Sequence, residues 1–355
     1  MRVLIAFLLF PFFVNGQMMM VGASGVIANV NTPKFGVLVN SSTLTNTQKA
    51  DVSADGLGCK YVRGALTIRT WSGSSTRYEI YRTKLGLGKQ IPVINGINGG
   101  ATPYYVGAEE LGWYADTLAL ILDKYPDIKI VAIENEAINV TYLGDASGFH
   151  TGNLAQYGAQ VQAAYPVCKA RGVKMIESGI YGIGLYGLIY RDLVAQGRTT
   201  DAAAYAAIAM TPAQLSNVQS GVNAITEVKI RMVDSILNLS PYFDYMNVHL
   251  YEVFNPNIVD EAGQTVSTEL YIKYAQDYIQ KRTHKQVVTN EIGQRNNTQP
   301  DLVTSLLAQY YRYGFPIIQW FSGVGSAGSQ PLNNETTGEI NANGTAFKNY
   351  IQSKQ

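Results

Sequence analysis

Histidine and cysteine are scarce in this chain of 355 residues, which has three histidines and two cysteines. No H-x-H, HExxH or CxxC arrangement occurs, so the usual ligands of a zinc or iron site are missing. From one pair of cysteines, Cys59 and Cys168, a structural disulfide cannot be inferred, and two buried free thiols are an equally good interpretation. The sequence therefore implies no metal and no cofactor.

Charge is also sparse, because charged residues make up 15% of the chain and leave a net charge of +1. The lysines and arginines do not gather into the basic stripe that neutralising phosphates requires, which argues against nucleic acid as a partner. A serine hydrolase is disfavoured by the lack of a G-x-S-x-G elbow. Tyrosine, in contrast, is abundant at 24 residues, and exposed aromatic rings offer flat faces for sugars.

Long apolar runs are absent after the first residues of the chain. Residues 1–16 combine Arg2, an apolar run from Val3 to Val14 and small residues before Gln17, a pattern typical of a secretory signal peptide. An uncleaved anchor is the alternative. No later stretch approaches the roughly 20 apolar residues that span a bilayer, so we expect a soluble mature chain with no membrane partner.

Strand-like and helix-like segments alternate along residues 17–355, which argues for βα units on a parallel sheet. Eight units in one domain predict an α/β fold, the (β/α)8 TIM barrel. An open doubly wound sheet is the alternative, but no Gly-rich phosphate loop follows the first strand. The expected strands are 35–40, 60–68, 91–95, 128–136, 173–178, 245–251, 287–291 and 316–321, and helices are expected at 76–85, 108–125 and 154–170.

A long segment, Ile180 to Phe243, separates the fifth and sixth strands and predicts a helical insertion. We expect one helix at 201–210 and a second at 213–237, with the glycine-rich stretch GIGLYG at 182–187 as a loop. A βα connection of this size lies at the active face of a barrel. Its tyrosines at positions 186, 190 and 205 either form a wall of a cleft or pack the insertion onto the barrel.

Two of the expected strands end in a glutamate that follows an asparagine: IKIVAIENE ends at Glu136 and QVVTNE ends at Glu291. These are the fourth and seventh strands, whose C-terminal ends face each other across the catalytic side of a barrel. Two carboxylates about 5.5 Å apart can cleave a glycosidic bond with retention, one as acid/base and the other as nucleophile. A lone glutamate after a strand is usually a solvated loop residue or a helix cap, so the pair carries the prediction.

On these residues the chain resembles the large clan of retaining (β/α)8 glycoside hydrolases that includes the cellulase-like family 5. The resemblance implies that Glu136 is the acid/base and Glu291 the nucleophile, and that Asn135 binds a sugar hydroxyl next to the reacting carbon. The strand-end residues that match the clan are Arg63, Asn135, Glu136, His249, Tyr251, Glu291 and Trp320.

Each match has a physical role that can be tested. Arg63 would hold Glu291 ionised through a charge-assisted hydrogen bond, and Tyr251 could donate another to the same carboxylate. Trp320 would form the floor of the subsite that binds the reacting sugar, and the alternative is that it packs in the core. Arg63 could instead be only a structural ion-pair partner, and His249 a buried histidine satisfied by the backbone.

The chain also departs from the clan in ways that favour a divergent family. Alanine follows the fourth-strand Asn-Glu pair where many members have proline, and the third strand offers Asn95 and Asn98 where family 5 often has a histidine. Glu177 and Glu252 are spare acids that could bind substrate, and we assign neither of them a catalytic role.

The sequence thus predicts a glycosidase that cleaves β-linked carbohydrate by double displacement. A sugar-binding barrel without turnover and a transglycosylase that uses the same residues are the alternatives, and neither the glycan nor the oligomeric state is readable. Glycans at two of the sequons would crowd the expected site, so we expect a bacterial protein, secreted or periplasmic, whose sequons are accidents of composition. The six N-x-S/T sequons begin at Asn40, Asn139, Asn238, Asn296, Asn334 and Asn343.

Overall fold

A computed structural model describes residues 32–96, 106–139, 151–251, 269–295, 300–323 and 329–355, which belong to one compact unit, Thr32–Gln355. The leader expected at 1–16 lies outside these residues, as do Asn98 and Glu252. None of the helices in the described part of the chain combines the length and the apolar composition needed to cross a bilayer.

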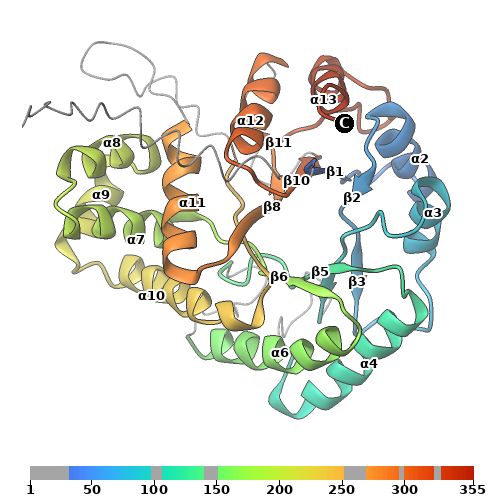
Figure 1. Ribbon diagram of the computed structural model, residues 1–355, viewed down its shortest axis with the longest axis horizontal. Helices are drawn as coiled ribbons and strands as arrows, with labels where there is room; N and C mark the ends of the chain where they lie inside the picture. Colours follow the sequence, from blue (N-terminus) through green and yellow to red (C-terminus); the bar gives the residue numbers. More distant parts are fainter. Residues whose placement is uncertain (1–31, 97–105, 140–150, 252–268, 296–299, 324–328) are drawn as a thin grey trace, which may run out of the picture. The chain divides into compact units, whose positions relative to one another are not determined.

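Within the described residues, nine parallel strands form one sheet that curls around a central core (Figure 1). A separate antiparallel pair consists of β9 (Gln294–Arg295) and β11 (Ser329–Gln330). The strands of the main sheet are β1 (Lys34–Val39), β2 (Tyr61–Val62), β3 (Ala65–Thr67), β4 (Val93–Asn95), β5 (Ile130–Ile133), β6 (Lys174–Ile176), β7 (Tyr245–Asn247), β8 (Gln286–Ile292) and β10 (Ile317–Ser322).

The sheet closes into a barrel because its two ends belong to one interrupted strand. The strand order is β2-β1-β10-β8-β7-β6-β5-β4-β3, and only Arg63 and Gly64 separate β2 from β3. Toward β1, the N–H of Arg63 donates to the carbonyl of Val37 at 3.0 Å. Toward the segment that leads into β4, the carbonyl of Val62 accepts the N–H of Ile91 at 3.0 Å. The prediction of an eight-unit (β/α)8 barrel is confirmed.

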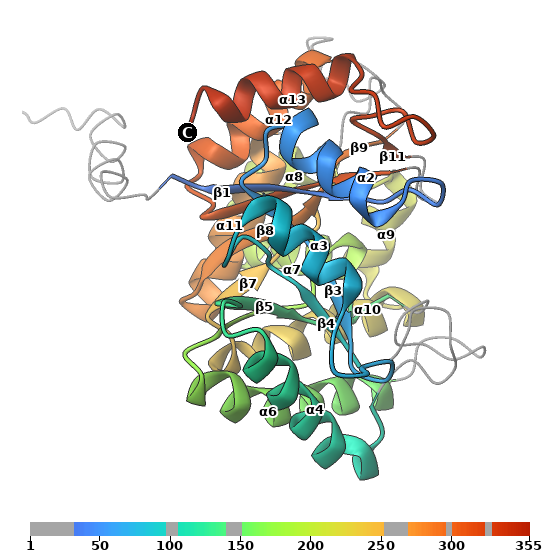
Figure 2. The same ribbon diagram turned by 90° about the vertical axis from the view of Figure 1, so that its right-hand side faces the viewer.

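Helices surround the barrel, as the two perpendicular views show (Figures 1 and 2). The helix expected at 76–85 has those bounds, and the helix expected at 108–125 forms in two parts. The helical segments are α2 (Asn46–Asp51), η2 (Val52–Gly56), α3 (Thr76–Leu85), η3 (Ala108–Glu110), α4 (Leu111–Lys124), α6 (Thr151–Ala170), α7 (Gly182–Ala195), α8 (Thr199–Ala209), α9 (Pro212–Ser220), α10 (Ala224–Asn238), η4 (Ser240–Tyr242), α11 (Glu269–Thr283), α12 (Pro300–Arg312) and α13 (Ala342–Gln352).

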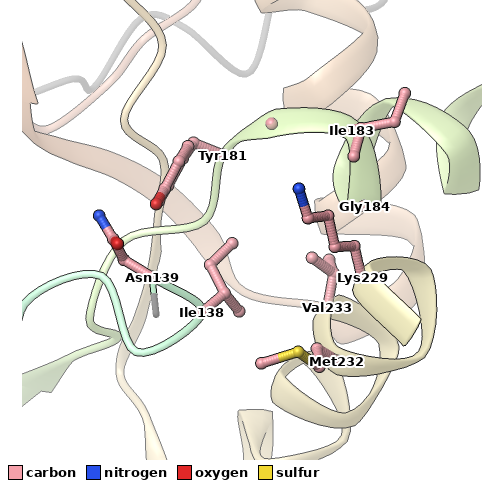
Figure 3. A pocket seen from close by; sticks show the side chains of 9 residues that line it. Ile138, Asn139, Tyr181, Ile183, Gly184, Lys229, Met232 and Val233 are labelled. Atoms are coloured by element: carbon pink, nitrogen blue, oxygen red, sulfur yellow. The ribbon is translucent and has the colours of Figure 1, made fainter. Parts of the chain in front are cut away.

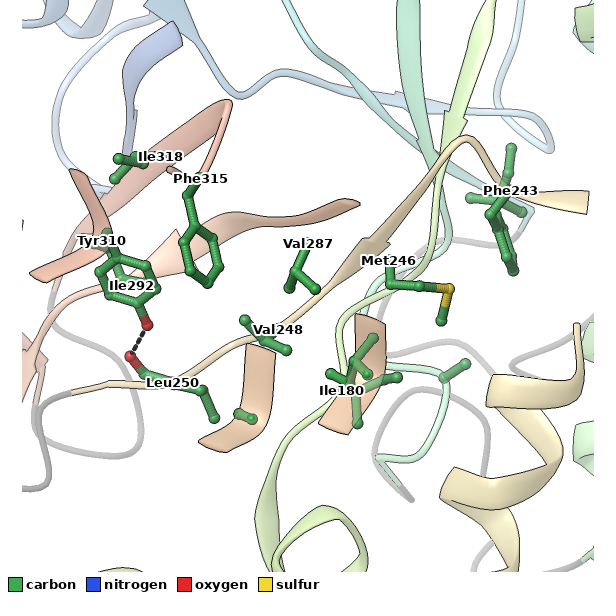
Figure 4. Packing of buried hydrophobic residues seen from close by; sticks show 14 of the residues in the cluster. Ile180, Phe243, Met246, Val248, Leu250, Val287, Ile292, Tyr310, Phe315 and Ile318 are labelled. Atoms are coloured by element: carbon green, nitrogen blue, oxygen red, sulfur yellow. Dashed lines mark hydrogen bonds between the residues drawn. The ribbon is translucent and has the colours of Figure 1, made fainter. Parts of the chain in front are cut away.

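Side chains along the strands alternate between the barrel interior and the layer under the helices. In the outer layer lie Met246 of β7 and, beyond its end, Val248 and Leu250, and Tyr310 of α12 donates its hydroxyl proton to the carbonyl of Leu250 at 2.7 Å (Figure 4). A second cluster of small and branched apolar residues fills the interior: Ile91, Val93, Ile130, Ala132, Ile176, Val288 and Ile317. Polar side chains continue the interior beyond this cluster, toward the C-terminal ends of the strands.

The expected insertion between the fifth and sixth barrel strands is present as α7 to α10, but with different boundaries. The single helix expected at 213–237 is two helices, because Gly221 ends α9 in the left-handed conformation (φ 66°). Asn223 then caps α10 by accepting the N–H of Thr226 at 2.9 Å. Local capping residues therefore divide a segment whose apolar pattern alone looks continuous.

The stretch expected as a loop at 182–187 is instead the first turns of α7. Its glycines allow close packing on α10. A Cβ at Gly184 would lie 2.4 Å from the carbonyl oxygen of Lys229, and one at Gly187 would lie 2.7 Å from the side chain of Ile230. The glycine-rich sequence therefore reflects a tight helix crossing.

Two tyrosines of the insertion pack it against α11, a helix outside the insertion. Tyr205 is fully buried, and its ring stacks on that of Tyr271 of α11 with centroids 6.4 Å apart. Tyr186 shares a hydroxyl hydrogen bond with Tyr271, and the Tyr190 hydroxyl accepts from Gln219 at 2.9 Å. The packing interpretation of Tyr186 and Tyr205 is the one that these contacts support.

Candidate active site

The backbone turns sharply after β5, in the stretch that carries the first glutamate. Glu134 and Glu136 both have left-handed backbone angles, with φ of 61° and 48°, a conformation that costs about 1–3 kcal/mol for a residue other than glycine. Hydrogen bonds to neighbouring strand ends hold the turn: Glu134 N–H donates to Ile94 O at 3.0 Å and Glu136 N–H donates to Ser178 O at 2.8 Å. The strand expected to reach Glu136 therefore ends at Ile133.

The second glutamate lies on a bulge of β8. Ile318 of β10 pairs with Thr289, and two residues later Trp320 pairs with Ile292, so β8 contains one extra residue at this point. The bulge therefore lies between these two pairs, at Asn290 and Glu291. A bulge interrupts the alternation of side chains and is common beside active sites. Both Asn290 and Glu291 can therefore face the polar interior.

The two strand ends bring the glutamates together. One side-chain oxygen from each of Glu136 and Glu291, together with a ring nitrogen of His249, lie within 4.8 Å of one another. This spacing agrees with the roughly 5–5.5 Å of retaining glycosidases and is shorter than the roughly 6.5–9.5 Å of inverting ones. Each carboxylate keeps an accessible edge, because the two side chains are 13% and 12% exposed.

Glu291 is held in its ionised form. Arg63, whose side chain is buried, donates to one carboxylate oxygen, and the Tyr251 hydroxyl donates to the other at 2.7 Å. Burial opposes ionisation, but the charges of Arg63 and His249 and the hydrogen bond from Tyr251 outweigh it and lower the pKa of Glu291 to about 2. The same guanidinium also donates to Asn135 Oδ1, which ties the two Asn-Glu segments together.

His249 is oriented by a chain of amides behind it. Asn247 Oδ1 accepts the N–H of Asn290 at 3.1 Å, and its Nδ2 donates to the carbonyl of Glu177 at 3.1 Å, so its amide can take only one orientation. Asn247 Nδ2 also donates to Asn290 Oδ1 at 2.8 Å, which leaves that oxygen facing His249 Nε2 at 2.7 Å. Nε2 must therefore carry a hydrogen.

The other ring nitrogen, His249 Nδ1, lies 2.9 Å from Glu136 Oε1. Because both atoms are acceptors when unprotonated, one proton must lie between them. Burial would lower the pKa of His249, but the charge of Glu291 and the hydrogen bond and charge of Glu136 outweigh it and raise that pKa. His249 thus contacts the acid/base candidate and is too buried, at 3% exposure, to serve as a broad substrate surface.

Asn139 is a member of the site that sequence reasoning did not single out. Its Nδ2 donates to Glu136 Oε2 at 3.1 Å, and its backbone N–H donates to Glu136 O at 2.7 Å. The only available signal was its position three residues after Glu136, at the head of a sequon. A glycan on Nδ2 would place a bulky group on an atom that contacts Glu136.

Trp320 does not reach the carboxylates. Its side chain is fully buried in the outer layer, where its ring meets the edge of Phe347 of α13 with centroids 5.9 Å apart. Strand alternation places the half-buried Phe321 on the interior side instead. The interpretation of Trp320 as a sugar platform is therefore wrong, because it assigned the residue to the opposite face of its strand.

Two further carboxyls near the site are buried. Glu177 accepts the N–H of Gly179 at 2.8 Å and a hydrogen bond from Ser178, and it has no exposed surface, so it cannot bind substrate as a spare acid. Glu134 accepts the N–H of Gly96 at 2.6 Å and was not anticipated. Burial raises the pKa of each to about 7.

The spacing of Glu136, His249 and Glu291 would also allow a cation to bridge them. The electrostatics of the site oppose this. The permanent positive charge of Arg63 is already paired with Glu291, and the raised pKa of His249 means that it gains a proton more readily than an isolated histidine. A metal ion would have to displace or repel both groups.

No protein-family model matches the chain, and no curated protein matches it in sequence. Solved structures do match its fold. A β-glycosidase, BGL167, is 13% identical with a TM-score of 0.52, covering 86% of this chain and 85% of its own. ZgEngAGH5_4, solved in complex with a cellotriose, is 12% identical with a TM-score of 0.52, covering 92% and 97%. XacCel5A is 10% identical with a TM-score of 0.51, covering 91% and 99%.

At these identities the likeness is one of fold. The fold of this chain is therefore the (β/α)8 barrel found in glycoside hydrolases of the cellulase-like clan, and the resemblance that the strand ends indicated is confirmed at that level.

Proposed function

We propose that this protein is a retaining glycoside hydrolase that cleaves β-linked oligo- or polysaccharide by double displacement. The observation that carries the proposal is the pair Glu136 and Glu291, whose oxygens lie within 4.8 Å at opposite strand ends, with Arg63 bonded to Glu291. A carbohydrate-binding barrel has no need of a carboxylate kept ionised beside a second carboxylate.

In the first step Glu291 attacks the anomeric carbon, and a carbon–oxygen bond to the enzyme forms as the glycosidic bond breaks. Glu136 gives its proton to the departing oxygen. Because Asn135 Oδ1 accepts from Arg63, its amide nitrogen remains to donate to the sugar hydroxyl beside the reacting carbon. That contact is strongest in the transition state.

In the second step Glu136, now a carboxylate, takes a proton from water, and the water oxygen attacks the anomeric carbon and releases Glu291. His249 is placed to stabilise Glu136 in its charged form between the two steps, because Nδ1 lies 2.9 Å from Oε1. Asn139 supports the other oxygen of Glu136. No cofactor takes part in the proposed reaction.

The neighbours in fold support carbohydrate as the ligand, since one of them was solved with a bound cellotriose and another is named a β-glycosidase. The expected leader at 1–16 would take the protein out of the cytoplasm, and we propose that it acts as a secreted or periplasmic enzyme. Polymeric β-glycans outside the cell are substrates that suit such a location.

The proposal is tested by assaying the unmodified protein, Glu136→Gln and Glu291→Gln on chromogenic β-glycosides and on plant and fungal polysaccharides. We expect Glu291→Gln to be inactive on every substrate. Glu136→Gln should fail on polysaccharide but keep activity on aryl glycosides whose leaving groups need no proton. The exposed Glu339→Gln is the matched control and should behave as the unmodified protein.

Turnover that survives the loss of Glu291 would contradict the mechanism. If the unmodified protein binds glycans and turns none over, the barrel is a carbohydrate-binding protein. Transfer of the glycosyl group to added sugar in place of water would identify a transglycosylase, which shares the first step.

A further inference from the structure

Two buried asparagines lie behind His249, and the proposed mechanism gives neither of them a role. Asn247 and Asn290 are 0% and 1% exposed. Two backbone groups fix the amide of Asn247, because its oxygen accepts the N–H of Asn290 and its nitrogen donates to the carbonyl of Glu177. That nitrogen also donates to Asn290 Oδ1, so the second amide presents its oxygen to His249 Nε2 at 2.7 Å. The backbone thus determines which atom the imidazole meets.

The ring of His249 is confined as well as hydrogen-bonded. Gly179, with φ 115°, packs so closely against it that a Cβ there would lie 2.4 Å from Cε1 and from Nε2. The N–H of Gly179 donates to Glu177 at 2.8 Å, and the N–H of His249 donates to the carbonyl of Ile180 at 3.0 Å. These contacts keep the imidazole directed at Asn290 on one side and at Glu136 on the other.

The two oxygens of Glu136 have different partners. Oε1 lies 2.9 Å from His249 Nδ1, and Oε2 accepts from Asn139 Nδ2 at 3.1 Å. Asn139 lies beside Ile138 in the turn after β5, at the edge of a pocket of about 230 Å³ against α7 and α10 (Figure 3). When Nδ1 carries a hydrogen, Oε1 is an acceptor, so the proton that Glu136 transfers belongs on Oε2.

His249 also has a carboxylate on each side, because one oxygen of Glu136, one of Glu291 and a ring nitrogen lie within 4.8 Å of one another. In the first step of the proposed reaction, negative charge leaves Glu291 as its oxygen bonds to the anomeric carbon. The same charge appears on Glu136 as its proton goes to the leaving oxygen. An imidazolium at this place would therefore face one ionised carboxylate both before and after the step.

We propose that Asn247 and Asn290 are positioning residues that keep a proton on both ring nitrogens of His249 throughout the reaction. The fixed imidazolium then balances the charge of Glu291 in the free enzyme and the charge of Glu136 in the glycosyl-enzyme. The inference rests on the proposed glycosidase function.

The charges around the ring act in both directions. Burial opposes the protonated form of His249, as does Arg63, but the charges of Glu291 and Glu136 outweigh them and raise its pKa above the ordinary 6.5. Burial raises the pKa of the nearby Glu177 to about 7, and the charge of His249 works against that rise. An amide oxygen behind the ring stabilises the imidazolium without adding another carboxylate to this site.

The test is nitrogen NMR of the protein labelled with isotope-enriched histidine, in which the signals of His249 are identified by their absence from His249→Gln. The chain has only three histidines. At pH 7, where an ordinary histidine is mostly neutral, we expect hydrogens on both ring nitrogens of His249. Both should remain in the intermediate trapped on Glu291 with a 2-deoxy-2-fluoro-β-glycoside. An unprotonated ring nitrogen in either state would overturn the inference.

Two substitutions at Asn290 should move the titration of His249 in opposite directions. Asn290→Asp presents a carboxylate to Nε2 and should raise the midpoint by about one pH unit, whereas Asn290→Leu removes the acceptor and should lower it by about as much. The basic limb of the kcat/KM profile should move with the midpoint. A general loss of structure does not produce shifts of opposite sign.

The same two changes at Asn343, a buried amide on the outer helix α13, are the matched controls and should move neither quantity. Shifts that the Asn343 variants reproduce, an unmoved midpoint in both Asn290 variants, or a basic limb that does not follow the midpoint would overturn the inference. The measurement on the unmodified protein stands whether or not a variant folds.

The NMR measurement on the free protein needs no turnover, which separates this inference from the proposed function. A His249 imidazolium that responds to Asn290, in a protein that hydrolyses nothing, would keep the positioning role and refute the glycosidase. Turnover of β-glycosides by a protein whose His249 is neutral at pH 7 would refute the positioning role alone.

Discussion

At the residue scale, two glutamates with the same functional group have different neighbours. Glu291 accepts from Arg63 and Tyr251, while Glu136 faces His249 and Asn139. Glu291 is paired with the permanent positive charge of Arg63, whereas Glu136 contacts His249, a group that can gain or lose a proton. In the proposed mechanism, these different environments divide the roles of nucleophile and acid/base between two identical side chains.

Arg63→Met tests the electrostatic half of this arrangement. Without the guanidinium the pKa of Glu291 should rise from about 2 toward its ordinary value of 4.5. The acid limb of the kcat/KM profile should then move to higher pH, and the uncompensated buried carboxylate should cost about 3–5 kcal/mol of unfolding free energy at pH 7.

The sign of the pH dependence of stability follows from the lowered pKa. Stability from Glu291 is fully present above pH 4.5 and is lost as the pH falls toward 2, so Arg63→Met should lose less stability across that window. Arg171→Met, which removes an exposed pair with Asp123, should cost no more than about 1 kcal/mol. An unmoved acid limb in Arg63→Met would show that Arg63 does not set the charge of Glu291.

Trp320→Phe separates packing from substrate binding at the strand end of β10. Because Trp320 is fully buried against Phe347, the smaller ring should lower the unfolding free energy by about 1–2 kcal/mol and leave KM unchanged. Denaturant unfolding and steady-state kinetics measure the two effects. A large rise in KM with unchanged stability would restore the sugar-platform role.

At the element scale, the strand ends show what sequence could and could not predict. His249 and Tyr251 were predicted from the resemblance to the glycoside hydrolase clan, and the structure places them beside Glu136 and Glu291 respectively. Trp320 was misplaced by one position, and only the pairing of β10 with β1 and β8 reveals which face it occupies. The bulge at Glu291 and the left-handed turn at Glu136 depend on contacts between strands distant in sequence, so no local pattern could indicate them.

Glu134→Gln tests the buried carboxyl that ties β5 to the loop after β4 and to α6. Since burial raises the pKa of Glu134 to about 7, the folded state keeps a proton that the unfolded chain releases near 4.5. Its contribution to stability should therefore fall as the pH rises from 4.5 to 7, by up to about 3 kcal/mol.

Glu134→Gln keeps an oxygen for the N–H of Gly96 and removes the titration, so its unfolding free energy should decline less over this range. Urea unfolding at pH 5 and pH 7.5 measures the difference, with Glu339→Gln as the exposed control. Identical pH dependence in Glu134→Gln and the unmodified protein would place the titration elsewhere.

At the scale of the whole molecule, eight alternating units were sufficient to predict the barrel. The barrel topology in turn predicted that the two Asn-Glu segments lie close together, at the C-terminal ends of its strands. The long insertion was predicted as well, but its helix boundaries were not, because Gly221 and Asn223 act through local capping that the apolar pattern does not show.

The central claim is that Glu291 becomes covalently glycosylated. The most direct measurement is intact-protein and peptide mass spectrometry after incubation with 2,4-dinitrophenyl 2-deoxy-2-fluoro-β-glycosides, whose fluorine slows release of the intermediate. The account predicts a mass increase of one fluoroglycosyl group, located on the peptide that contains Glu291 and absent in Glu291→Gln. An adduct on Glu136, or hydrolysis of ordinary β-glycosides with no adduct formed by the matching fluorosugar, would contradict it.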